Sequence, residues 1–392
     1  MPKAKKYLII NPGSASRKYA LYEGKREILT AYFEKSASTG NFIATFKATK
    51  WEARKEIDKK TYNEGMSVFL DFLLEEKMIA EKKDVDAVGF RIVAPGIFFS
   101  KTRPINADYV KKLKEMCGAA PLHIKPVISE IEKSNKLLPS ARKIGVSDSA
   151  FHSTIPARAS SYGLPSAIAQ KLEIRKFGYH GISVESVLRQ IKERFKKTPA
   201  RIIVCHLGSG SSATAVKNGK SVDTSMGFTP LEGLLMGTRP GDIGAGAIIH
   251  MAKKMKLSPD KMDELFNKKS GLLGVSEKTS DVRELLKLEK KNPKAALALE
   301  IFAYRVKKYI GAYIAILGGL DLLVFTAAIG ERSDIMREKI CRELEPMGIV
   351  LDKKKNKKTT RGDGLIQAQK SKVKIAVIKT DETGEIALKI QK

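Results

Sequence analysis

The sequence predicts an α/β protein built from two similar domains. Two observations support this fold class: a repeat placed half a chain apart, and strand-like apolar runs that alternate with helical patterns. A chain of 392 residues has room for two or three domains, and it can bury a sizeable core without covalent cross-links. We expect one domain over residues 1–150, joined by the C-terminal tail 383–392, and a second domain over residues 151–382.

The repeat relates residues 7–25, YLIINPGSASRKYALYEGK, to residues 202–220, IIVCHLGSGSSATAVKNGK. In both copies an apolar run meets a small polar loop with Gly-Ser, and a second strand-like run then ends in a tight turn at Gly24 or Gly219. Two unrelated hairpins are the alternative, but the matched glycines favour a duplication. Each loop can point backbone N–H groups and serine hydroxyls at a phosphate.

Further strands are predicted over residues 85–93, 143–146 and 321–326, because each is a short apolar run between polar segments. The last of them leads into a predicted glycine turn at residues 327–331 and a helix from about residue 333. A strand, a glycine turn and a helix in this order form a place where ligands bind in open α/β sheets.

A long helix is predicted to begin at Asn292 and Pro293, which are a typical cap and first-turn residue. Its apolar residues recur at helical spacing from Leu299 to Leu317, and we interpret this stripe as plain core packing. The apolar stretch over residues 310–330 is not read as a membrane span. Gly318, Gly319 and Asp321 divide it into the end of a helix and a buried strand, each too short to cross a bilayer.

The chain is strongly basic, with 72 Lys and Arg against 43 Asp and Glu and a net charge of +29. The lysines are scattered and aromatic residues are only 7%, so we expect no dedicated nucleic-acid partner. The densest basic run, residues 353–358, is predicted to be a solvated loop. The positive field should help to attract anionic substrates. Three cysteines without a CxxC pair predict a reducing, cytoplasmic location.

Polar clusters inside apolar runs mark the candidate site. The most informative is the glycine-rich segment over residues 223–242, DTSMGFTPLEGLLMGTRPGD, because long glycine-rich stretches within compact domains are usually functional. Arg239 in this segment and Arg91 in an apolar run fit the recognition of a planar anion or a transferring phosphoryl group. Taken alone, His152 and His206 are interpreted as structural residues.

The motifs occur in one order over nearly the whole chain, and together they resemble the acetate kinase family. They are INPGSAS (10–16), FRIVAPG (90–96), PLH (121–123), SDSAFH (147–152), FGYHG (177–181), CHLGSGSS (205–212), the segment 223–242, SGLLGVS (270–276), FTAAIGE (325–331) and KTDE (379–382). This family belongs to the acetate and sugar kinase, Hsp70 and actin superfamily. The resemblance implies a duplicated actin-like, ribonuclease H-like fold with the active site in the cleft between the two domains.

The resemblance also implies reversible phosphoryl transfer from ATP to acetate, giving acetyl phosphate and ADP. Implied partners are these small molecules, Mg²⁺ or Mn²⁺, and a second copy of the chain in a homodimer, with no membrane partner. The implied catalytic residues are Arg91, His123, Asp148, His180 and Arg239. Asn11 and Glu382 would serve the metal. The implied pocket for the acetyl methyl is formed by Val93, Leu122, Tyr179 and Pro230. The implied nucleotide and phosphate contacts are Ser14, Ser16, His206, Gly208, Ser209, Gly210, Ser211, Asp281, Arg283, Ala328, Ile329 and Gly330.

Several positions depart from the family pattern. Ser209 stands where the family has Asn, Ala328 where it has Gly, and Arg332 where it has Asn. A methyl at Ala328 is expected to narrow the nucleoside pocket. These departures leave a pyrophosphate-dependent enzyme as one alternative. A propionate or butyrate kinase is another, because a small apolar pocket separates such acids only weakly. The net charge of +29 leaves a non-catalytic polyanion-binding protein on the same fold as the third.

Overall fold

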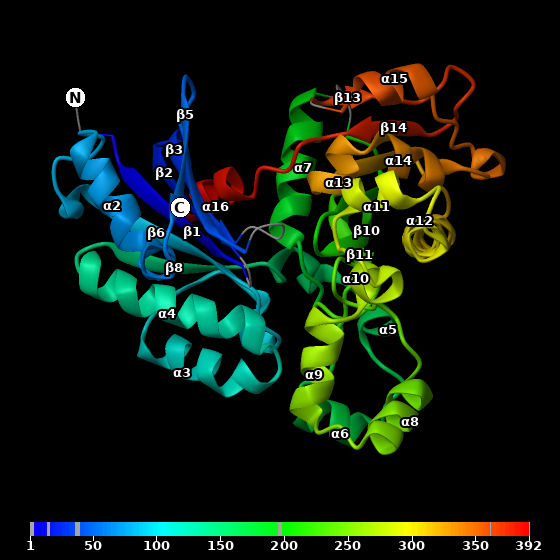
Figure 1. The fold of residues 1–392 in the computed structure, drawn as a ribbon, viewed down its shortest axis with the longest axis horizontal. Coiled ribbons are helices and arrows are strands. Elements are labelled where there is room, and N and C mark those ends of the chain that lie inside the picture. Colours follow the sequence, from blue (N-terminus) through cyan, green and yellow to red (C-terminus); the bar gives the residue numbers. More distant parts are fainter. Residues whose placement is uncertain (1–3, 14–15, 36–39, 195–197, 361, 392) are drawn as a thin grey trace. The chain divides into compact units, whose positions relative to one another are not determined.

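The computed structural model describes the chain except residues 1–3, 14–15, 36–39, 195–197, 361 and 392. The chain divides into two compact units (Figure 1). The first contains Met1–Ala150 and Asp381–Lys392, and the second contains Phe151–Thr380. The boundary that we expected after residue 382 lies after Thr380. Glu382 therefore belongs to the first unit, not to the second as expected.

The described residues of the first unit form an eight-stranded sheet in the order β5-β4-β3-β2-β1-β6-β8-β7. β1 is antiparallel to β2 but parallel to β6, and β6 is parallel to β8. The strands are β1 (Lys6–Pro12), β2 (Ser16–Glu23), β3 (Arg26–Lys35), β4 (Phe42–Lys47), β5 (Glu52–Ile57), β6 (Val85–Ile92), β7 (Arg103–Pro104) and β8 (Arg142–Ser147).

Helices cover the first sheet with apolar side chains, which explains why β1 and β6 are nearly all buried. The helices are α1 (Lys59–Asn63), α2 (Gly65–Glu75), α3 (Ala107–Glu115), α4 (Pro121–Leu137) and α16 (Glu382–Ile390). The red C-terminal helix α16 lies against the blue strand β1 in Figure 1. A Cβ on Gly89 of β6 would lie 2.8 Å from Ile386 and 3.1 Å from Ile390, so this glycine permits α16 to pack closely.

The described residues of the second unit form a six-stranded sheet in the order β11-β10-β9-β12-β14-β13. β9 is antiparallel to β10 but parallel to β12, and β12 is parallel to β14. This repeats the pattern around β1 in the first unit, as the sequence repeat predicts. The strands are β9 (Arg201–Leu207), β10 (Ser211–Lys217), β11 (Lys220–Thr224), β12 (Leu322–Thr326), β13 (Gly364–Leu365) and β14 (Lys374–Val377).

The long helix α12 (Pro293–Leu317) supplies much of the core of the second unit. Asn292 caps it by accepting a hydrogen bond from the N–H of Ala295, and the helix ends at a left-handed Gly318. The other helices are α5 (Ala157–Ser160), α6 (Ser166–Lys171), α7 (Gly181–Arg194), α8 (Ala245–Met255), α9 (Pro259–Lys268), α10 (Gly271–Ser276), α11 (Val282–Leu288), α13 (Ala327–Arg332), α14 (Asp334–Cys341) and α15 (Lys353–Lys358). No described helix is both long enough and apolar enough to cross a membrane.

Two expectations for the second unit were wrong. The segment after β12 is not a simple glycine turn, because the helix α13 begins directly after the strand. The chain changes direction at Ala327, which has a φ of 64°. The lysine run 353–358 is a helix, α15, and not a loop. Asp352 caps this helix by accepting hydrogen bonds from the N–H groups of Lys354 and Lys355, and Asn356 is only 2% exposed.

Candidate active site

The first unit gathers polar side chains where three parallel strands end. Asn11 lies near the end of β1, Arg91 near the end of β6, and Asp148 follows β8 directly. Because β1, β6 and β8 are parallel neighbours, their carboxyl ends meet at one edge of the sheet. The N–H of Asp148 also donates to the carbonyl of Ile92 at 2.9 Å, which extends the pairing past the strands.

Arg91 is the centre of this group. Its Nη2 donates to Oδ2 of Asp148 at 2.8 Å, and its Nη1 donates to Oδ1 of Asn11 at 3.3 Å. Glu382 completes the group from the first residue of α16. It accepts a hydrogen bond from Nδ2 of Asn11 at 3.2 Å and lies 3.8 Å from Nη2 of Arg91. Four of the residues implied by the resemblance are therefore joined in one cluster.

The cluster keeps Arg91 charged. Burial alone would lower the pKa of Arg91, but Asp148 and Glu382 raise it above its ordinary value. The side chain of Asp148 is fully buried, whereas those of Arg91 and Glu382 retain 17% and 16% exposure. The result is a fixed cation with a planar set of donors, which suits a carboxylate or a phosphoryl group.

The sequence reasoning missed Lys18. This residue lies on β2 directly opposite Asn11. Burial lowers the pKa of Lys18, but the interaction with the Tyr32 side chain and the charges of Glu382 and Glu27 raise it above its ordinary value overall. A lysine just before the apolar run of β2 was the available signal. It adds a second cation in the electrostatic range of Glu382.

The remaining expected residues of the first unit lie near helix and strand ends. His123 and Leu122 are in the first turn of α4, and Val93 follows β6, all three partly buried. Ser16 begins β2, and its carbonyl accepts a hydrogen bond from the N–H of Gly13 at 2.7 Å. Ser14 lies outside the described residues. The roles expected for these residues stay predictions.

In the second unit, the loop between β9 and β10 is closed by its own hydrogen bonds. The N–H of Gly208 donates to the carbonyl of Gly210 at 3.0 Å, and Oγ of Ser211 donates to the carbonyl of Gly208 at 3.1 Å. The carbonyl of Ser209 accepts from the N–H of Gly237 at 2.9 Å. This contact binds the glycine-rich segment 223–242 to the loop between β9 and β10. In the sequence repeat, this loop corresponds to the segment that follows Asn11.

Arg239 and His180 meet at this loop. A Cβ placed on Gly210 would lie 2.8 Å from Nη2 of Arg239 and 3.4 Å from Nε2 of His180. Nη1 of Arg239 donates to the carbonyl of Pro230 at 2.7 Å, which fixes the direction of the guanidinium. A cationic fork and an imidazole nitrogen therefore face the same glycine, whose missing side chain lets the guanidinium of Arg239 approach the loop closely.

His206 lies behind His180 instead of in the glycine loop. The two rings stack with centroids 4.0 Å apart and an interplanar angle of 19°. Nδ1 of His180 is 3.0 Å from Oγ of Ser212, and Nδ1 of His206 is 2.8 Å from Oγ of Ser183. Ser183 is in turn 2.7 Å from the hydroxyl of Thr380. The orientation of His180 is thus set by a polar network that the sequence pattern could not reveal.

The expected adenosine contacts are on α13, where Ala328 is exposed, Ile329 is partly buried and Gly330 is buried. A Cβ on Gly330 would lie 3.3 Å from the backbone of Phe325, so α13 packs tightly on the end of β12. Oε1 of Glu331 accepts hydrogen bonds from the N–H groups of Ala327 and Thr380, both at 2.9 Å. These bonds connect α13 to the segment that follows β14.

Asp281 and Arg283 bind each other at the start of α11. Asp281 caps the helix by accepting from the N–H of Arg283 at 2.8 Å and pairs with its guanidinium. The bonds to Arg283 hold the pKa of Asp281 below its ordinary value. A Cβ on Gly237 would contact both Ser209 and Ser280, so the cap lies next to the glycine loop.

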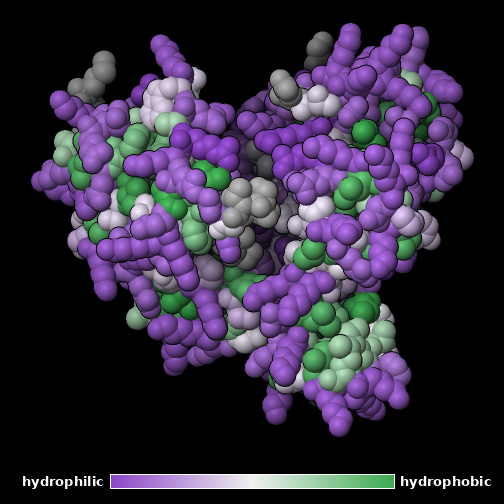
Figure 2. All heavy atoms as spheres, in the orientation of Figure 1, coloured by the Kyte–Doolittle hydropathy of each residue, from purple (hydrophilic) through white to green (hydrophobic). Residues whose placement is uncertain are grey.

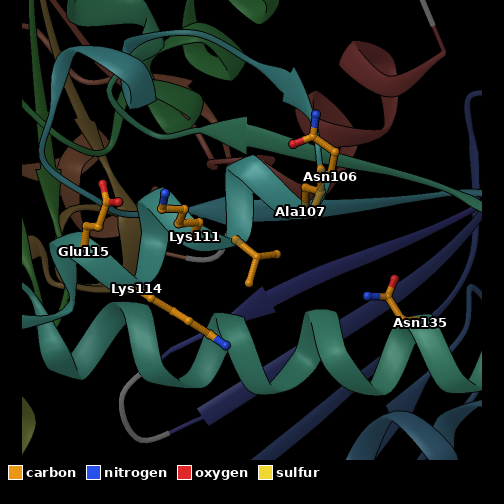
Figure 3. A pocket seen from close by; sticks show the side chains of 8 residues that line it. Asn106, Ala107, Lys111, Lys114, Glu115 and Asn135 are labelled. Carbon is orange, nitrogen blue, oxygen red and sulfur yellow. The ribbon is translucent and has the colours of Figure 1, made fainter.

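A separate cavity of about 880 Å³ lies in the first unit between α3 and α4 (Figure 3). Lys111, Lys114 and Glu115 project from α3, and Asn135 lies on α4. None of the residues predicted from the sequence lines this cavity. It is therefore not the site that the motifs define.

Two α/β units with the same strand arrangement around their central strands, β1 and β9, define a duplicated α/β protein, with a polar cluster at the strand ends of the first unit. The model of the Acetokinase family matches residues 6–388. The chain therefore belongs to the acetokinase family, as the motifs predicted.

Curated relatives agree over the full length. The chain is 42% identical to the acetate kinase of Dictyoglomus turgidum over 390 residues, covering 97% of this chain and 96% of the relative. It is also 42% identical to the acetate kinase of Brachyspira hyodysenteriae over 389 residues, covering 97% and 98%.

Solved structures confirm the fold. The acetate kinase of Porphyromonas gingivalis superposes with a TM-score of 0.86 at 37% identity, covering 99% of this chain and 100% of that chain. A propionate kinase from Francisella tularensis gives a TM-score of 0.89 at 36% identity, covering 98% of both chains. The duplicated actin-like fold that the family resemblance implied is thereby confirmed.

Proposed function

We propose that this protein transfers the γ-phosphoryl group of ATP to acetate, reversibly, giving acetyl phosphate and ADP. The observation that carries the proposal is the cluster of Arg91, Asp148, Asn11 and Glu382 at the ends of β1, β6 and β8. Direct in-line transfer needs positioning and charge stabilisation more than covalent help from the protein. A fixed guanidinium held by two carboxylates supplies both.

In this proposal the first unit provides the acceptor side. The guanidinium of Arg91 binds the acetate carboxylate or the transferring group, and Asp148 holds the guanidinium in place. His123 and Lys18 add polar and cationic groups on the same unit. Val93 and Leu122 of the first unit, and Tyr179 and Pro230 of the second, remain the residues that the family resemblance assigns to the methyl pocket.

The second unit provides the donor side. The loop of Gly208, Ser209, Gly210 and Ser211 binds the ATP phosphates through its backbone. Arg239 and Nε2 of His180, which face Gly210, stabilise the charge that develops on the transferring group.

The adenosine and ribose of ATP lie along α13 and the start of α11. Ala328, Ile329 and Gly330 contact the nucleoside, with Asp281 and Arg283 beside it. In this proposal His206 supports His180 and makes none of the phosphate contacts that the resemblance implies for it, because its ring stacks on the ring of His180.

The donor set fits a magnesium ion that travels with the nucleotide. The described residues contain no group of three His, Cys, Asp or Glu side chains able to hold a metal by themselves. Mg²⁺ usually keeps several waters and takes one or two carboxylates together with substrate phosphates. Glu382, with Asn11 beside it and Asp148 nearby, matches that requirement, and the ion would neutralise phosphate charge during transfer.

Propionate is the second candidate acceptor. The similarity to a propionate kinase structure at 36% identity favours testing it. A small apolar pocket separates acids that differ by one methylene by only about 1–3 kcal/mol. Acetate and propionate should therefore both react, in a ratio set by the methyl pocket.

The test is acyl phosphate formation trapped with hydroxylamine. Acetate, propionate and butyrate are each paired with ATP or pyrophosphate in the presence of Mg²⁺, with Arg239→Ala as the inactive control. We expect turnover with acetate and ATP that the control abolishes. Turnover with pyrophosphate alone would assign a different phosphoryl donor. No turnover with any pair, in either direction, would refute the kinase and favour a polyanion-binding protein.

We also propose that the protein is a cytoplasmic homodimer. The three cysteines, Cys117, Cys205 and Cys341, are free thiols, which suits a reducing compartment.

Most of the face in Figure 2 is hydrophilic, but hydrophobic side chains gather at the end of the second unit that carries α6, α8 and α9. Large exposed apolar residues in contiguous patches often mark protein interfaces. The exposed apolar residues at this end of the second unit include Leu164, Ile168, Leu172, Ile249 and Met255, which are 46–59% exposed.

Light scattering after size exclusion tests the assembly. The expected mass is twice 43.2 kDa, and a paired Ile168→Asp and Ile249→Asp variant should shift it toward the monomer. A wild-type protein that stays monomeric at all concentrations would contradict the dimer.

A further inference from the structure

The backbone just before α7 is held in an unusual conformation at the candidate catalytic histidine. Gly178 has a φ of 76° and His180 a φ of 61°. Positive φ is uncommon for a residue with a side chain, and it persists where the surrounding structure enforces it. The N–H groups of Phe177 and Gly178 both donate to the carbonyl of Gly227, which fixes the start of this segment.

His152 fixes the end of the same segment. Its Nε2 is 3.0 Å from the carbonyl oxygen of Tyr179, which belongs to the peptide bond that leads into His180. Its ring also packs on Gly178, where a Cβ would lie 2.8 Å from the imidazole. His152 is 3% exposed, so the contact is shielded from solvent. A hydrogen bond in such surroundings constrains the peptide strongly.

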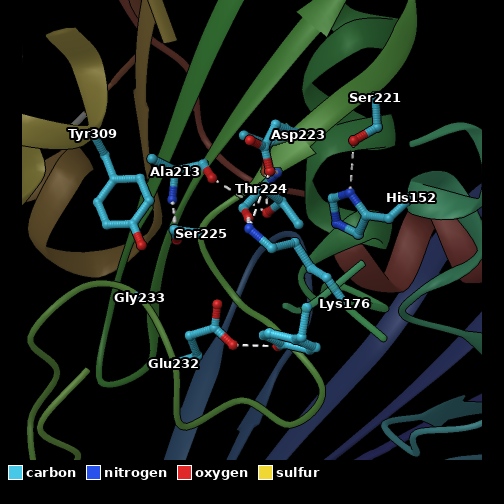
Figure 4. A network of polar contacts seen from close by, with 12 residues as sticks. His152, Lys176, Ala213, Ser221, Asp223, Thr224, Ser225, Glu232, Gly233 and Tyr309 are labelled. Carbon is cyan, nitrogen blue, oxygen red and sulfur yellow. Dashed lines mark hydrogen bonds and ion pairs between the residues drawn. The ribbon is translucent and has the colours of Figure 1, made fainter. Parts of the chain in front are cut away.

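Ser221 holds His152 from the other side, as Figure 4 shows. Its Oγ is 2.9 Å from Nδ1 of His152, and its own carbonyl accepts a hydrogen bond from Thr154 at 2.8 Å. A carbonyl can only accept, so Nε2 of His152 carries the proton and donates to Tyr179. Nδ1 is held by the Ser221 hydroxyl, which can donate or accept a hydrogen bond. The two contacts therefore place a proton on Nε2 and fix one ring orientation.

The peptide held by His152 determines where the ring of His180 points. Nδ1 of His180 meets Ser212, and Nε2 faces Gly210 together with Arg239. A rotation of the 179–180 peptide would move Nε2 away from that position. A displacement of about 1 Å at a reacting group can cost about 100-fold in rate.

We propose that His152 is a positioning residue for phosphoryl transfer, acting through the Tyr179 carbonyl on the backbone and ring of His180. The proposal rests on the proposed function for the role of His180, but the effect of His152 on the His180 ring can be measured without turnover. His152 itself does not touch the substrate in this proposal. Ser221 is the second member of the same device, because its hydroxyl holds Nδ1 and so fixes the orientation of the His152 ring.

The kinetic test is a double-mutant cycle between His152 and His180. We expect His152→Ala to lower kcat by about 10–100-fold with little change in the KM for acetate or ATP, because positioning and not binding is lost. His152→Gln should recover part of the rate, since its amide can donate to the Tyr179 carbonyl. Lys220→Ala, which changes the exposed neighbour of Ser221, is the matched control and should be neutral.

In the His180→Ala background, His152→Ala should cost almost nothing, because the group it positions is gone. An equal loss in both backgrounds would overturn the proposal and leave His152 with a general packing role. If His152→Ala does not fold, Ser221→Ala takes its place in the cycle, since it removes one hydroxyl and retains the ring.

A second measurement does not depend on activity. The protein has five histidines, so the ring resonances of ¹⁵N-histidine-labelled protein can be assigned one by one. In Ser221→Ala and His152→Ala we expect the His180 signals to shift, whereas those of His123 and the exposed His250 stay in place. Unchanged His180 signals would overturn the proposal even if the enzyme proved to use another substrate.

Discussion

The guanidinium of Arg91 donates a 2.8 Å hydrogen bond to the carboxylate of Asp148, which has no exposure to solvent. Each of the two charges makes the other tolerable, since a buried charge without its partner is costly. The pair therefore links the stability of the first unit to the orientation of a candidate catalytic group.

The first prediction concerns this pair. Asp148→Ala should lower kcat/KM for acetate by about 100-fold or more, because the Arg91 fork loses the group that orients it. Asp148→Asn should retain more activity, since its amide oxygen can still accept from Arg91. Steady-state kinetics check this, with the exposed Asp108→Asn as the matched control. Equal activity of Asp148→Ala and wild type would contradict the assignment.

The second prediction uses the glycine at which Arg239 and His180 meet. Gly210→Ala places a methyl 2.8 Å from Nη2 of Arg239, and the end of that flexible side chain must shift. We expect a loss in kcat of about 10–100-fold from misplacement, with almost unchanged thermal stability. Gly163→Ala serves as control because a Cβ there meets nothing within 4 Å. A large fall in melting temperature without a kinetic effect would argue against the site.

The third prediction concerns Arg337 on α14, which is fully buried and bound by carbonyl oxygens. It donates to the carbonyls of Gly330 and Glu331 on α13, and to Oδ1 of Asn356 on α15 at 2.7 Å. Burial lowers the pKa of Arg337 to about 10, so it stays charged at neutral pH. Arg337 therefore connects α15 to α13, the helix that we assign to nucleoside binding.

Asn356→Ala should lower the free energy of unfolding by about 1–3 kcal/mol, because it leaves a buried guanidinium N–H without its acceptor. The KM for ATP should also rise, since α13 loses part of its support. Denaturant unfolding and ATP titrations measure both, and the exposed Lys357→Ala should change neither. A stability loss without any change in ATP affinity would limit Arg337 to a structural role.

The fourth prediction concerns acid stability. Asp321 accepts hydrogen bonds from the guanidinium and the backbone N–H of Arg201, and these bonds lower the pKa of its carboxyl. A lowered carboxyl pKa stabilises the fold above the ordinary value near 4, and this stabilisation is lost as the pH falls through the folded pKa.

Asp321→Asn should therefore be less stable than wild type by about 1 kcal/mol at pH 7, a modest value because the pair is partly exposed. The difference should shrink between about pH 5 and pH 3. Urea unfolding at a series of pH values measures it. A difference that does not change with pH would mean that the ion pair contributes nothing.

The local chemistry of the sequence predicted much of the fold. The repeat predicted two strand–loop–strand units, and both sheets share one order around β1 and β9. The cap at Asn292, the break at Gly318 and the strand 321–326 were predicted because capping, turn residues and apolar runs act over a few neighbours. The loop predicted for residues 353–358 was wrong for the same reason. Asn356 is buried in this helix because it binds Arg337, a distant residue that a local sequence pattern does not include.

The sequence by itself determined the candidate site residues: the two arginines, the glycine loops and the acidic residues at strand ends. Only the tertiary structure decided which of them meet. Asn11 and Glu382 are 371 residues apart in the chain, yet they share a hydrogen bond because α16 returns to pack on β1. His206 stacks on His180 because β9 and the start of α7 converge. Periodicity and turn chemistry act locally, whereas such contacts depend on the order of strands in the sheet.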